Sequence, residues 1–212
     1  MTYEEFCAKH KVVTRSLKKF IDDQKVSYSA ETYQRFLTAV SSEILRYKAL
    51  IYEHPAGPLR ARKVHELVEA EIAQETEIPA SCFKGCSHCC HLEVEVTNYE
   101  TEILQGILMA GHPIDRVRLT LQGHRKLQDS AWRNLKKKAE NRCVFLGADE
   151  ACSIYEDRPV MCRRHSVTSN PQHCADLDEM ITVRYFPKVD VILSAANEDP
   201  DIRIGPMAKM LI

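Results

Sequence analysis

Cysteine is the residue type in this chain whose spacing most strongly suggests chemistry. Eight of the nine cysteines fall into two groups in the middle and later parts of the 212 residues. The first group is the string Cys82-Phe-Lys-Gly-Cys86-Ser-His-Cys89-Cys90-His91. The second group follows with spacings of nine, ten and twelve residues and comprises Cys143, Cys152, Cys162 and Cys174. Thiols that only fill a core scatter along a chain as small hydrophobic residues do, so this clustering needs another explanation.

Three chemistries could explain the clustering: disulfide bonding, burial as unreactive thiols, and metal ligation. Disulfides need an oxidising compartment, whereas this chain begins Met-Thr-Tyr-Glu-Glu, without the apolar segment of a secretory signal. Adjacent residues such as Cys89 and Cys90 rarely bridge each other, because the geometry is strained. Buried thiols would follow an apolar period, which the interleaved Gly85, Ser87 and His88 lack. The spacing therefore favours thiolates that converge on a soft cation, with Gly85 letting the backbone curl.

A second string, downstream, carries a resemblance to a known family. It reads Cys152-Ser-Ile-Tyr-Glu-Asp-Arg158-Pro-Val-Met-Cys162-Arg163. Together with the string from Cys82 to Cys90, it resembles the CxxCxxCC cysteine-cluster family, the YkgJ-type zinc- or iron-chelating domain, over about residues 80–175. The resemblance implies that the chain chelates zinc or iron through its cysteines. The candidate ligands are Cys82, Cys86, Cys89, Cys90, Cys143, Cys152, Cys162 and Cys174.

The chemistry of these donors leaves the identity of the metal open. Zinc sites and iron–sulfur clusters both accept four thiolates, so we expect Zn or Fe, with an iron–sulfur cluster as one form of the latter. Four thiolates give a zinc site a net negative charge, so we expect Arg158 and Arg163 to donate hydrogen bonds to sulfur around the ligands. Four histidines lie close to the cysteines in the sequence and are the best candidates for non-thiolate metal ligands: His88, His91, His165 and His173. We nevertheless favour a supporting or exposed role for each of them, because eight cysteines are available as ligands.

Three functions are compatible with such a cluster. The leading one is a metal-binding protein in which the ion is part of the folded module. The second is a metal-dependent enzyme of redox or group transfer, which the resemblance suggests because flagellin lysine N-methylase is a relative in the wider family. The third is an interaction module that the metal makes rigid, presenting a basic helix that includes Lys136, Lys137 and Lys138. No Gly-rich loop of the Rossmann type follows a strand pattern, and the sequence identifies no catalytic residue.

The apolar pattern predicts a mainly α protein with an irregular cysteine-rich centre. Three N-terminal helices are predicted over about residues 3–21, 33–51 and 59–78, and with short links they pack most simply as an antiparallel bundle. Ser29 is expected to cap the second of them. Cys7 lies on the apolar side of the first and is expected in its core.

The cysteine region itself is predicted to hold few long elements. Alternation over residues 92–96 indicates a short strand or an extended arm. Thr97 and Glu100 form a capping-box pattern that opens a helix, and a further helix is predicted over residues 113–139. Residues 143–181 lack periodicity, so we expect loops and short turns there.

These elements suggest three parts. An N-terminal helical region covers residues 1–79, and a metal-chelating module covers residues 80–180. A C-terminal segment, residues 181–212, is expected to pack on the module, with a helix or strand over about residues 186–196.

Charge and composition exclude several classes of protein. The chain holds 29 Lys and Arg against 30 Asp and Glu, a net charge of −1, so no global basic excess points to nucleic acid. The local excess over residues 113–142 lacks interleaved aromatic residues, so we favour a solvated face. No apolar run is long enough for a membrane span. The expected partner is therefore a metal ion, and the expected location is the cytoplasm.

Overall fold

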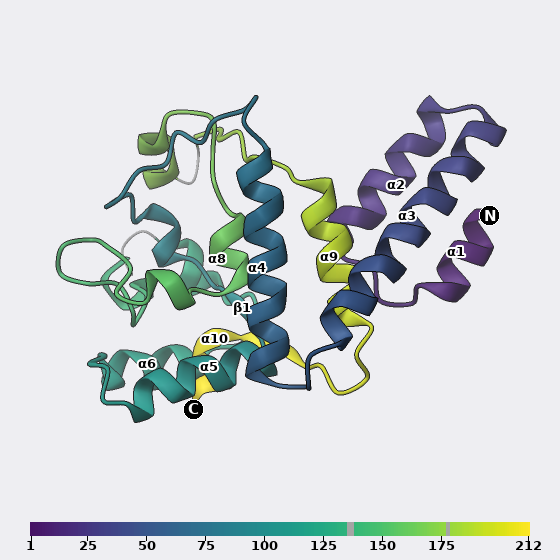
Figure 1. Ribbon diagram of the computed structural model, residues 1–212. Helices are drawn as coiled ribbons and strands as arrows, with labels where there is room; N and C mark the ends of the chain where they lie inside the picture. Colours follow the sequence, from purple (N-terminus) through teal and green to yellow (C-terminus); the bar gives the residue numbers. More distant parts are fainter. Residues whose placement is uncertain (135–137, 177–178) are drawn as a thin grey trace. The chain divides into compact units, whose positions relative to one another are not determined.

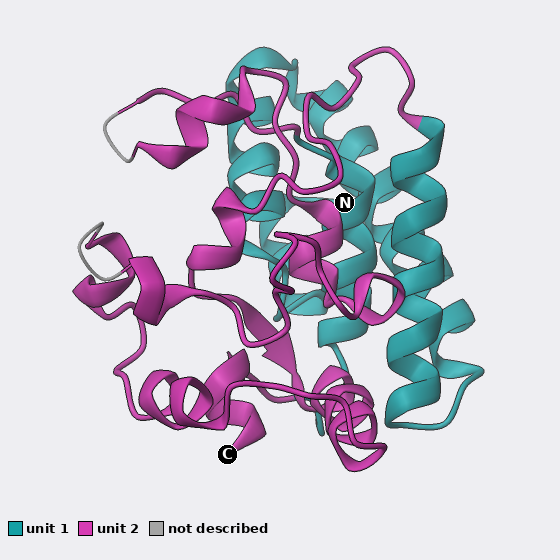
Figure 2. Cartoon of the chain, turned by 90° about the vertical axis from the view of Figure 1, so that its left-hand side faces the viewer, with its two compact units in different colours: residues 1–74, 185–202 teal, residues 75–184, 203–212 magenta. Residues whose placement is uncertain are grey.

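The computed structural model describes residues 1–134, 138–176 and 179–212. These residues are mainly α-helical, as predicted. They form two compact units, shown in Figure 2: a helical unit, residues 1–74 and 185–202, and a cysteine unit, residues 75–184 and 203–212. The expected C-terminal segment is thus shared between the two units. No helix in the described ranges combines the length and the apolar composition needed to cross a bilayer.

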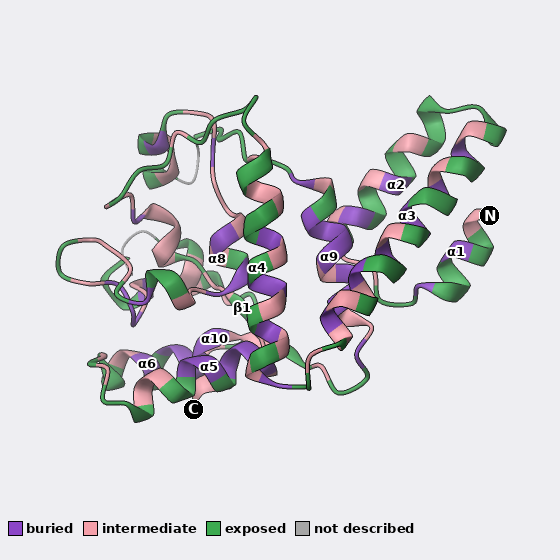
Figure 3. Ribbon diagram, viewed as in Figure 1, coloured by how far each residue is buried: buried purple, intermediate pink, exposed green. Residues whose placement is uncertain are grey.

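The helical unit is built around its last helix. Its elements are α1 (Tyr3–Lys9), α2 (Arg15–Ser27), α3 (Ala30–Tyr52), α4 (Pro58–Gln74) and α9 (Pro187–Asn197). α9 packs against α2, α3 and α4, and most of its residues are buried (Figure 3). Val189, Ile192 and Ala195 on this helix have no exposed surface. A segment that we expected to pack on the cysteine module therefore fills the core of the N-terminal helices.

Local signals explain where these helices begin. Ser29 caps α3 as predicted, its hydroxyl accepting a hydrogen bond from the backbone N–H of Thr32. The single helix predicted over residues 3–21 is wrong, because the chain leaves α1 at His10 and Thr14 starts a new helix by accepting from the N–H of Leu17.

Two further details of this unit differ from expectation. Cys7 is exposed, not buried, because the buried face of α1 is centred on its neighbour Phe6. The third N-terminal helix, α4, ends at Gln74, four residues short of the predicted end at Ile78.

The cysteine unit combines short helices with long connections (Figure 1). Its α-helices and strands are β1 (Glu95–Thr97), α5 (Asn98–Met109), α6 (Arg116–Gly123), α7 (Lys138–Asn141), α8 (Val160–Arg164), β2 (Ile204–Pro206) and α10 (Met207–Leu211), over the described residues. Single 3-10 turns are η1 (His88–His91), η2 (Ser130–Arg133), η4 (Tyr155–Asp157) and η5 (Pro171–Ala175). β1 and β2 pair antiparallel, with Val96 opposite Gly205. The predicted short strand and the expected loops and turns after residue 143 are confirmed over the described residues.

One hydrophobic cluster supports this unit. It consists of Val96, Leu104, Leu119, Val144, Phe145, Ile154, Met207 and Ala208. Cys143 and Cys152 pack against the cluster. The predicted capping box is present, since Thr97 and Glu100 each bond the other's backbone N–H, and it begins the helix that carries Leu104. The core therefore anchors two of the candidate ligands.

The long helix predicted over residues 113–139 is wrong. α6 ends at Gly123, and the chain then folds back, with Gln128 in a left-handed conformation at φ 56°. The Gln122 amide donates to the backbone carbonyls of Glu140 and Arg142, at 2.7 and 2.9 Å, which a continuous helix could not allow. Of the basic residues expected on that helix, Lys136 and Lys137 lie outside the described residues.

Candidate metal centre

The first cysteine string folds into two consecutive tight turns. Gly85 has φ 90°, a left-handed conformation that glycine adopts without strain, and the N–H of Cys86 bonds the carbonyl of Phe83 at 3.0 Å. The η1 turn follows, and in it the N–H of Cys90 bonds the carbonyl of Ser87 at 2.9 Å. The curl expected at Gly85 is confirmed, and it gathers the first four cysteines on one short loop.

The segment from Cys143 to Cys152 is joined directly to this string. The backbone N–H of Cys143 donates to the carbonyl of Cys90 at 2.7 Å. The chain then turns back on itself, so that Leu146 and Cys152 form an isolated antiparallel bridge. A backbone hydrogen bond therefore joins Cys90 and Cys143 directly, although they are 53 residues apart in the sequence.

Cys162 is positioned by a buried carboxylate. It lies on α8, whose first residue, Val160, donates its N–H to Glu100 Oε1 at 2.8 Å. Glu100 is only 6% exposed, and its other oxygen completes the capping box with Thr97. One glutamate thus links the start of α5 to the start of the helix that holds Cys162.

Cys82 and Cys174 lie on segments that approach each other at the other end of the cluster. The N–H of Ser81 bonds the carbonyl of Val167 at 2.8 Å, and the N–H of Val167 approaches Cys82 Sγ at 3.5 Å. Cys174 lies in the η5 turn, which contacts the η1 turn.

Electrostatic interactions divide the thiols into two sets that are connected through Cys89. The more buried set is Cys89, Cys90, Cys143, Cys152 and Cys162. Burial, together with smaller effects of the nearby Cys152 and Cys89, raises the pKa of Cys143 to about 11. Burial, followed by the thiols of Cys143, Cys89 and Cys152, raises the pKa of Cys162. Within this set each thiol therefore has other thiols as its close electrostatic neighbours.

The two adjacent cysteines behave as a pair. A hydrogen bond between them lowers the pKa of Cys89 to about 7, against the opposing effect of burial, and raises the pKa of Cys90. Cys143 and Cys162 raise the pKa of Cys90 further.

The outer set consists of Cys82, Cys86 and Cys174. Burial, and then the neighbouring thiol of Cys82, raises the pKa of Cys86. Burial, followed by Cys86 and Cys82, raises the pKa of Cys174. Cys89 acts on both of these thiols and so connects the two sets. Each of the eight predicted ligands thus interacts electrostatically with at least one other, although within the described ranges the Cys, His, Asp and Glu side chains form no group of three that could hold an ion as they stand.

The two arginines predicted around the ligands have different environments. Arg163 is buried, and its guanidinium donates to the backbone carbonyls of Arg158 and Glu156, which fixes the turn before α8. Arg158 stacks on the ring of Tyr155, 4.0 Å from its centroid. Burial raises the pKa values of Cys152 and Cys162, and the charge of Arg158 partly offsets this effect; the same charge contributes to the lowered pKa of Cys89. Its Nε atom is buried and has no hydrogen-bond acceptor within the described part of the chain.

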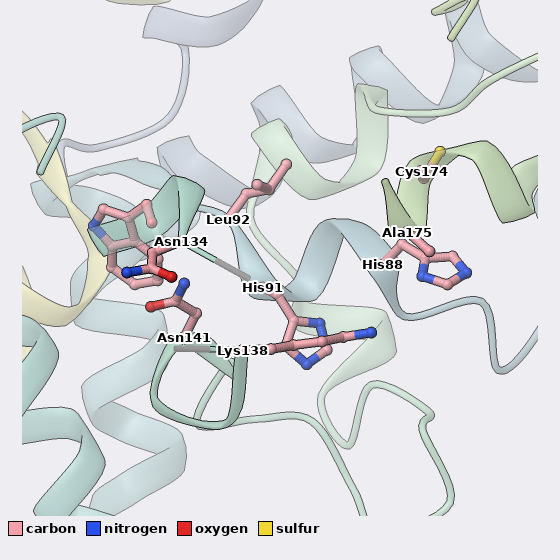
Figure 4. Close-up of a pocket in the computed structure, with 9 residues that line it drawn as sticks. His88, His91, Leu92, Asn134, Lys138, Asn141, Cys174 and Ala175 are labelled. Carbon is pink, nitrogen blue, oxygen red and sulfur yellow. The ribbon is translucent and has the colours of Figure 1, made fainter. Parts of the chain in front are cut away.

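Two histidines of the first cysteine string, His88 and His91, line a small pocket together with Cys174 (Figure 4). The pocket has a volume of about 30 Å³, and its walls include His88, His91, Lys138 and Asn141. His91 Nδ1 lies 3.1 Å from the carbonyl of Ser87. Burial, with a smaller effect of Lys138, lowers the pKa of His91. The imidazole is therefore held next to the cysteine string and favours its neutral form.

The donor set fits a thiophilic metal. Thiolates are soft ligands that suit zinc and iron–sulfur sites, and here thiols from segments distant in sequence act on one another. Negative charge at these positions is costly without a cation, because burial and like-charged neighbours raise the pKa values of Cys86, Cys143, Cys152, Cys162 and Cys174. The unpartnered Nε of Arg158 adds a donor of the kind that bonds ligand sulfur.

Other contributors were not identified from the sequence. The link from Glu100 to α8 was missed, although the capping-box pattern had singled out the residue. Ser87, Arg142 and Glu150 were missed as a group, because nothing in the local sequence pairs residues so far apart.

Comparison with known proteins agrees with the cysteine pattern. Residues 81–179 match the family model described as "CxxCxxCC: Putative zinc- or iron-chelating domain". No curated protein and no solved structure matches the chain. The family description supports metal binding and leaves zinc and iron as alternatives.

Proposed function

Since residues 81–179 match the model of the CxxCxxCC domain, we propose that this protein binds zinc or iron through the thiolates of its cysteine unit. The observation that carries the proposal is that backbone hydrogen bonds join the first cysteine string to segments distant in sequence. The N–H of Cys143 bonds the carbonyl of Cys90, and the N–H of Ser81, next to Cys82, bonds the carbonyl of Val167.

The more buried set supplies the main ligands in this proposal. These are Cys89, Cys90, Cys143, Cys152 and Cys162, with Cys82, Cys86 and Cys174 as the outer donors. When bound, the ion supplies positive charge that neutralises the thiolates and links the segments that carry them. Because the ligand segments are otherwise short loops, metal binding would contribute directly to the folding of the unit.

Arg158 has a distinct role in the proposal. Its charge acts on three thiols of the buried set, and its Nε–H is available to a ligand sulfur. Arg163 supports it indirectly, since the Arg163 guanidinium bonds the backbone carbonyl of Arg158 at 2.7 Å. Arg163 therefore holds the turn that presents Arg158.

The direct test is elemental analysis of the full chain, purified without oxygen or chelator, together with its visible spectrum. We expect zinc or iron in stoichiometric amount. Cys90→Ser and Cys162→Ser should each lose most of that metal, because each removes a half-buried donor of the main ligand set. Cys7→Ser is the matched control, since Cys7 is an exposed thiol of the helical unit. A wild-type metal content near zero would refute the proposal.

A second candidate function is a redox or group-transfer enzyme that uses iron. The pocket lined by His88, His91, Lys138 and Cys174 favours it, because it sets titratable side chains beside an outer donor. Iron with labile sulfide and a coloured protein would support this candidate. Zinc in a colourless protein would count against it and leave the metal-binding function in place.

A further inference from the structure

The cysteine string and the loop between Cys143 and Cys152 are joined by side chains as well as by backbone. Glu150 lies in this loop, and its two carboxylate oxygens have different partners. Oε2 accepts a hydrogen bond from the hydroxyl of Ser87, inside the first string. Oε1 forms an ion pair with Arg142, next to Cys143. One carboxylate therefore connects the two segments that carry most of the candidate ligands.

The backbone of Glu150 is held in an unfavourable conformation. Its φ is 60°, in the left-handed region that residues with a Cβ rarely adopt. A tight turn imposes it, in which the N–H of Glu150 bonds the carbonyl of Gly147 at 3.1 Å and the N–H of Gly147 bonds the carbonyl of Ala151 at 2.8 Å. Strain of this kind persists where the surrounding structure requires it, and it is concentrated at functional sites.

Arg142 completes the arrangement. Besides its ion pair with Glu150, its guanidinium donates to the backbone carbonyl of Gly147, at the base of the same turn. Arg142 therefore holds both the side chain and the loop of Glu150. Ser87 is 9% exposed, so its hydroxyl has little access to water in place of the carboxylate. None of the three side chains belongs to the candidate ligand set.

We propose that Ser87, Glu150 and Arg142 form a positioning clamp that holds the two halves of the metal centre together and slows the release of the ion. The inference rests on the proposed function, because a clamp matters only if the cysteines bind a metal. It assigns these residues no contact with the ion. Their effect is transmitted through the backbone of the Cys86–Cys90 turn and of the Cys143–Cys152 loop.

The test measures how fast the ion leaves. Metal-free full chain is loaded with Zn²⁺ alone, which thiolate sites bind more tightly than Fe²⁺, and the zinc is then transferred to a chromophoric chelator. Supporting residues around metal ligands affect affinity by about 10- to 100-fold, so we expect Glu150→Asn to release zinc about tenfold faster than wild type. Asn tolerates the left-handed backbone, so this substitution relieves strain in the loop, which would by itself slow the release of zinc. Asn is too short to bridge both partners, so faster release would report the loss of the bridge.

Matched variants separate the clamp from general effects. Ser87→Ala removes one partner and should accelerate release less than Glu150→Asn. Glu150→Gln keeps the length and the acceptor for Ser87 but loses the charge that attracts Arg142, so it should fall between wild type and Glu150→Asn. Glu156→Gln is the control, since it neutralises an exposed carboxylate of the same unit, and it should leave the rate unchanged. Circular dichroism of each loaded variant checks that the fold is retained.

The outcomes distinguish the two proposals. A wild-type chain that takes up neither zinc nor iron refutes metal binding and the clamp together. Wild-type uptake with equal release rates for wild type, Glu150→Asn and Ser87→Ala overturns the clamp alone. Equal acceleration by Glu156→Gln also overturns it, because the effect would then follow net charge and not the bridge.

Discussion

The two units of this protein bury polar groups in opposite ways. In the helical unit, His10 is 2% exposed, with Nδ1 2.7 Å from Glu198 Oε1 and Nε2 2.8 Å from the Ser41 hydroxyl. Lys48 donates to the other oxygen of Glu198 at 2.7 Å. In the cysteine unit, by contrast, the half-buried thiol of Cys162 has mainly other thiols as its charged neighbours, and Arg158 supplies positive charge.

The two clusters differ in whether residues of the same unit compensate the charges of their buried or half-buried groups. The helical unit pairs each group of its buried cluster with a partner of complementary charge or hydrogen-bonding capacity, as buried polar groups require. The cysteine unit brings together groups whose charged forms repel one another. A bound cation would make this arrangement electrostatically favourable, and we therefore propose metal dependence as the property that separates the two units.

Metal removal should have the largest effect. Structural zinc contributes about 10–16 kcal/mol to small thiolate modules at neutral pH, so chelation should unfold much of residues 80–175 while α1–α4 and α9 stay folded. Hydrogen exchange followed by mass spectrometry, with and without chelator, measures both regions in one sample. Uniform loss of protection in both units, or no change in either, would remove the contrast between them.

Loss of Glu198 should destabilise the helical unit. Glu198→Ala leaves His10 and Lys48 without their carboxylate, and we expect a loss of about 2 kcal/mol in the free energy of unfolding, the range of hydrogen bonds to charged groups. Denaturant unfolding measures it. Metal content should stay at the wild-type value, and a decrease would show that the two units do not behave separately.

Acid should weaken the same cluster to a smaller extent. Burial alone would raise the pKa of Glu198, but hydrogen bonds from Lys48 and His10 outweigh it and lower the pKa below the ordinary value of 4.5. The ionised carboxylate therefore contributes stability above about pH 4.5, and this contribution is lost as the pH falls through the lowered pKa. Glu198→Gln should flatten this part of the stability profile between pH 5 and pH 3. An unchanged profile in the variant would assign the acid sensitivity to other groups.

The smallest effect is expected at a helix cap. Ser29→Ala removes the hydroxyl that accepts from Thr32 N–H at the start of α3, at a cost of about 1 kcal/mol. Ser29→Asp keeps an acceptor at that position and should restore most of the stability. Neither variant should alter the zinc release rate, which tests again whether a change in the helical unit reaches the cysteines.

The successful predictions share a physical feature, which is that their causes lie within a few residues. The caps at Ser29 and Thr97, the left-handed Gly85 and the short strand after the first string follow from adjacent side chains and from the conformational range of glycine. One of the failed predictions depends instead on distant partners. The helix over residues 113–139 is interrupted because Gln122 bonds carbonyls 18 and 20 residues further along the chain.

Residue type and short-range spacing are enough to predict the helical class, several helix starts and the set of thiols. Three other features depend on contacts between distant segments: α9 fills the core of the N-terminal helices, Glu100 reaches α8, and Glu150 bridges Ser87 and Arg142. Each of these contacts joins segments that are distant in the sequence. Burial and complementary charge between the two segments stabilise such a contact, and no short-range sequence pattern predicts it.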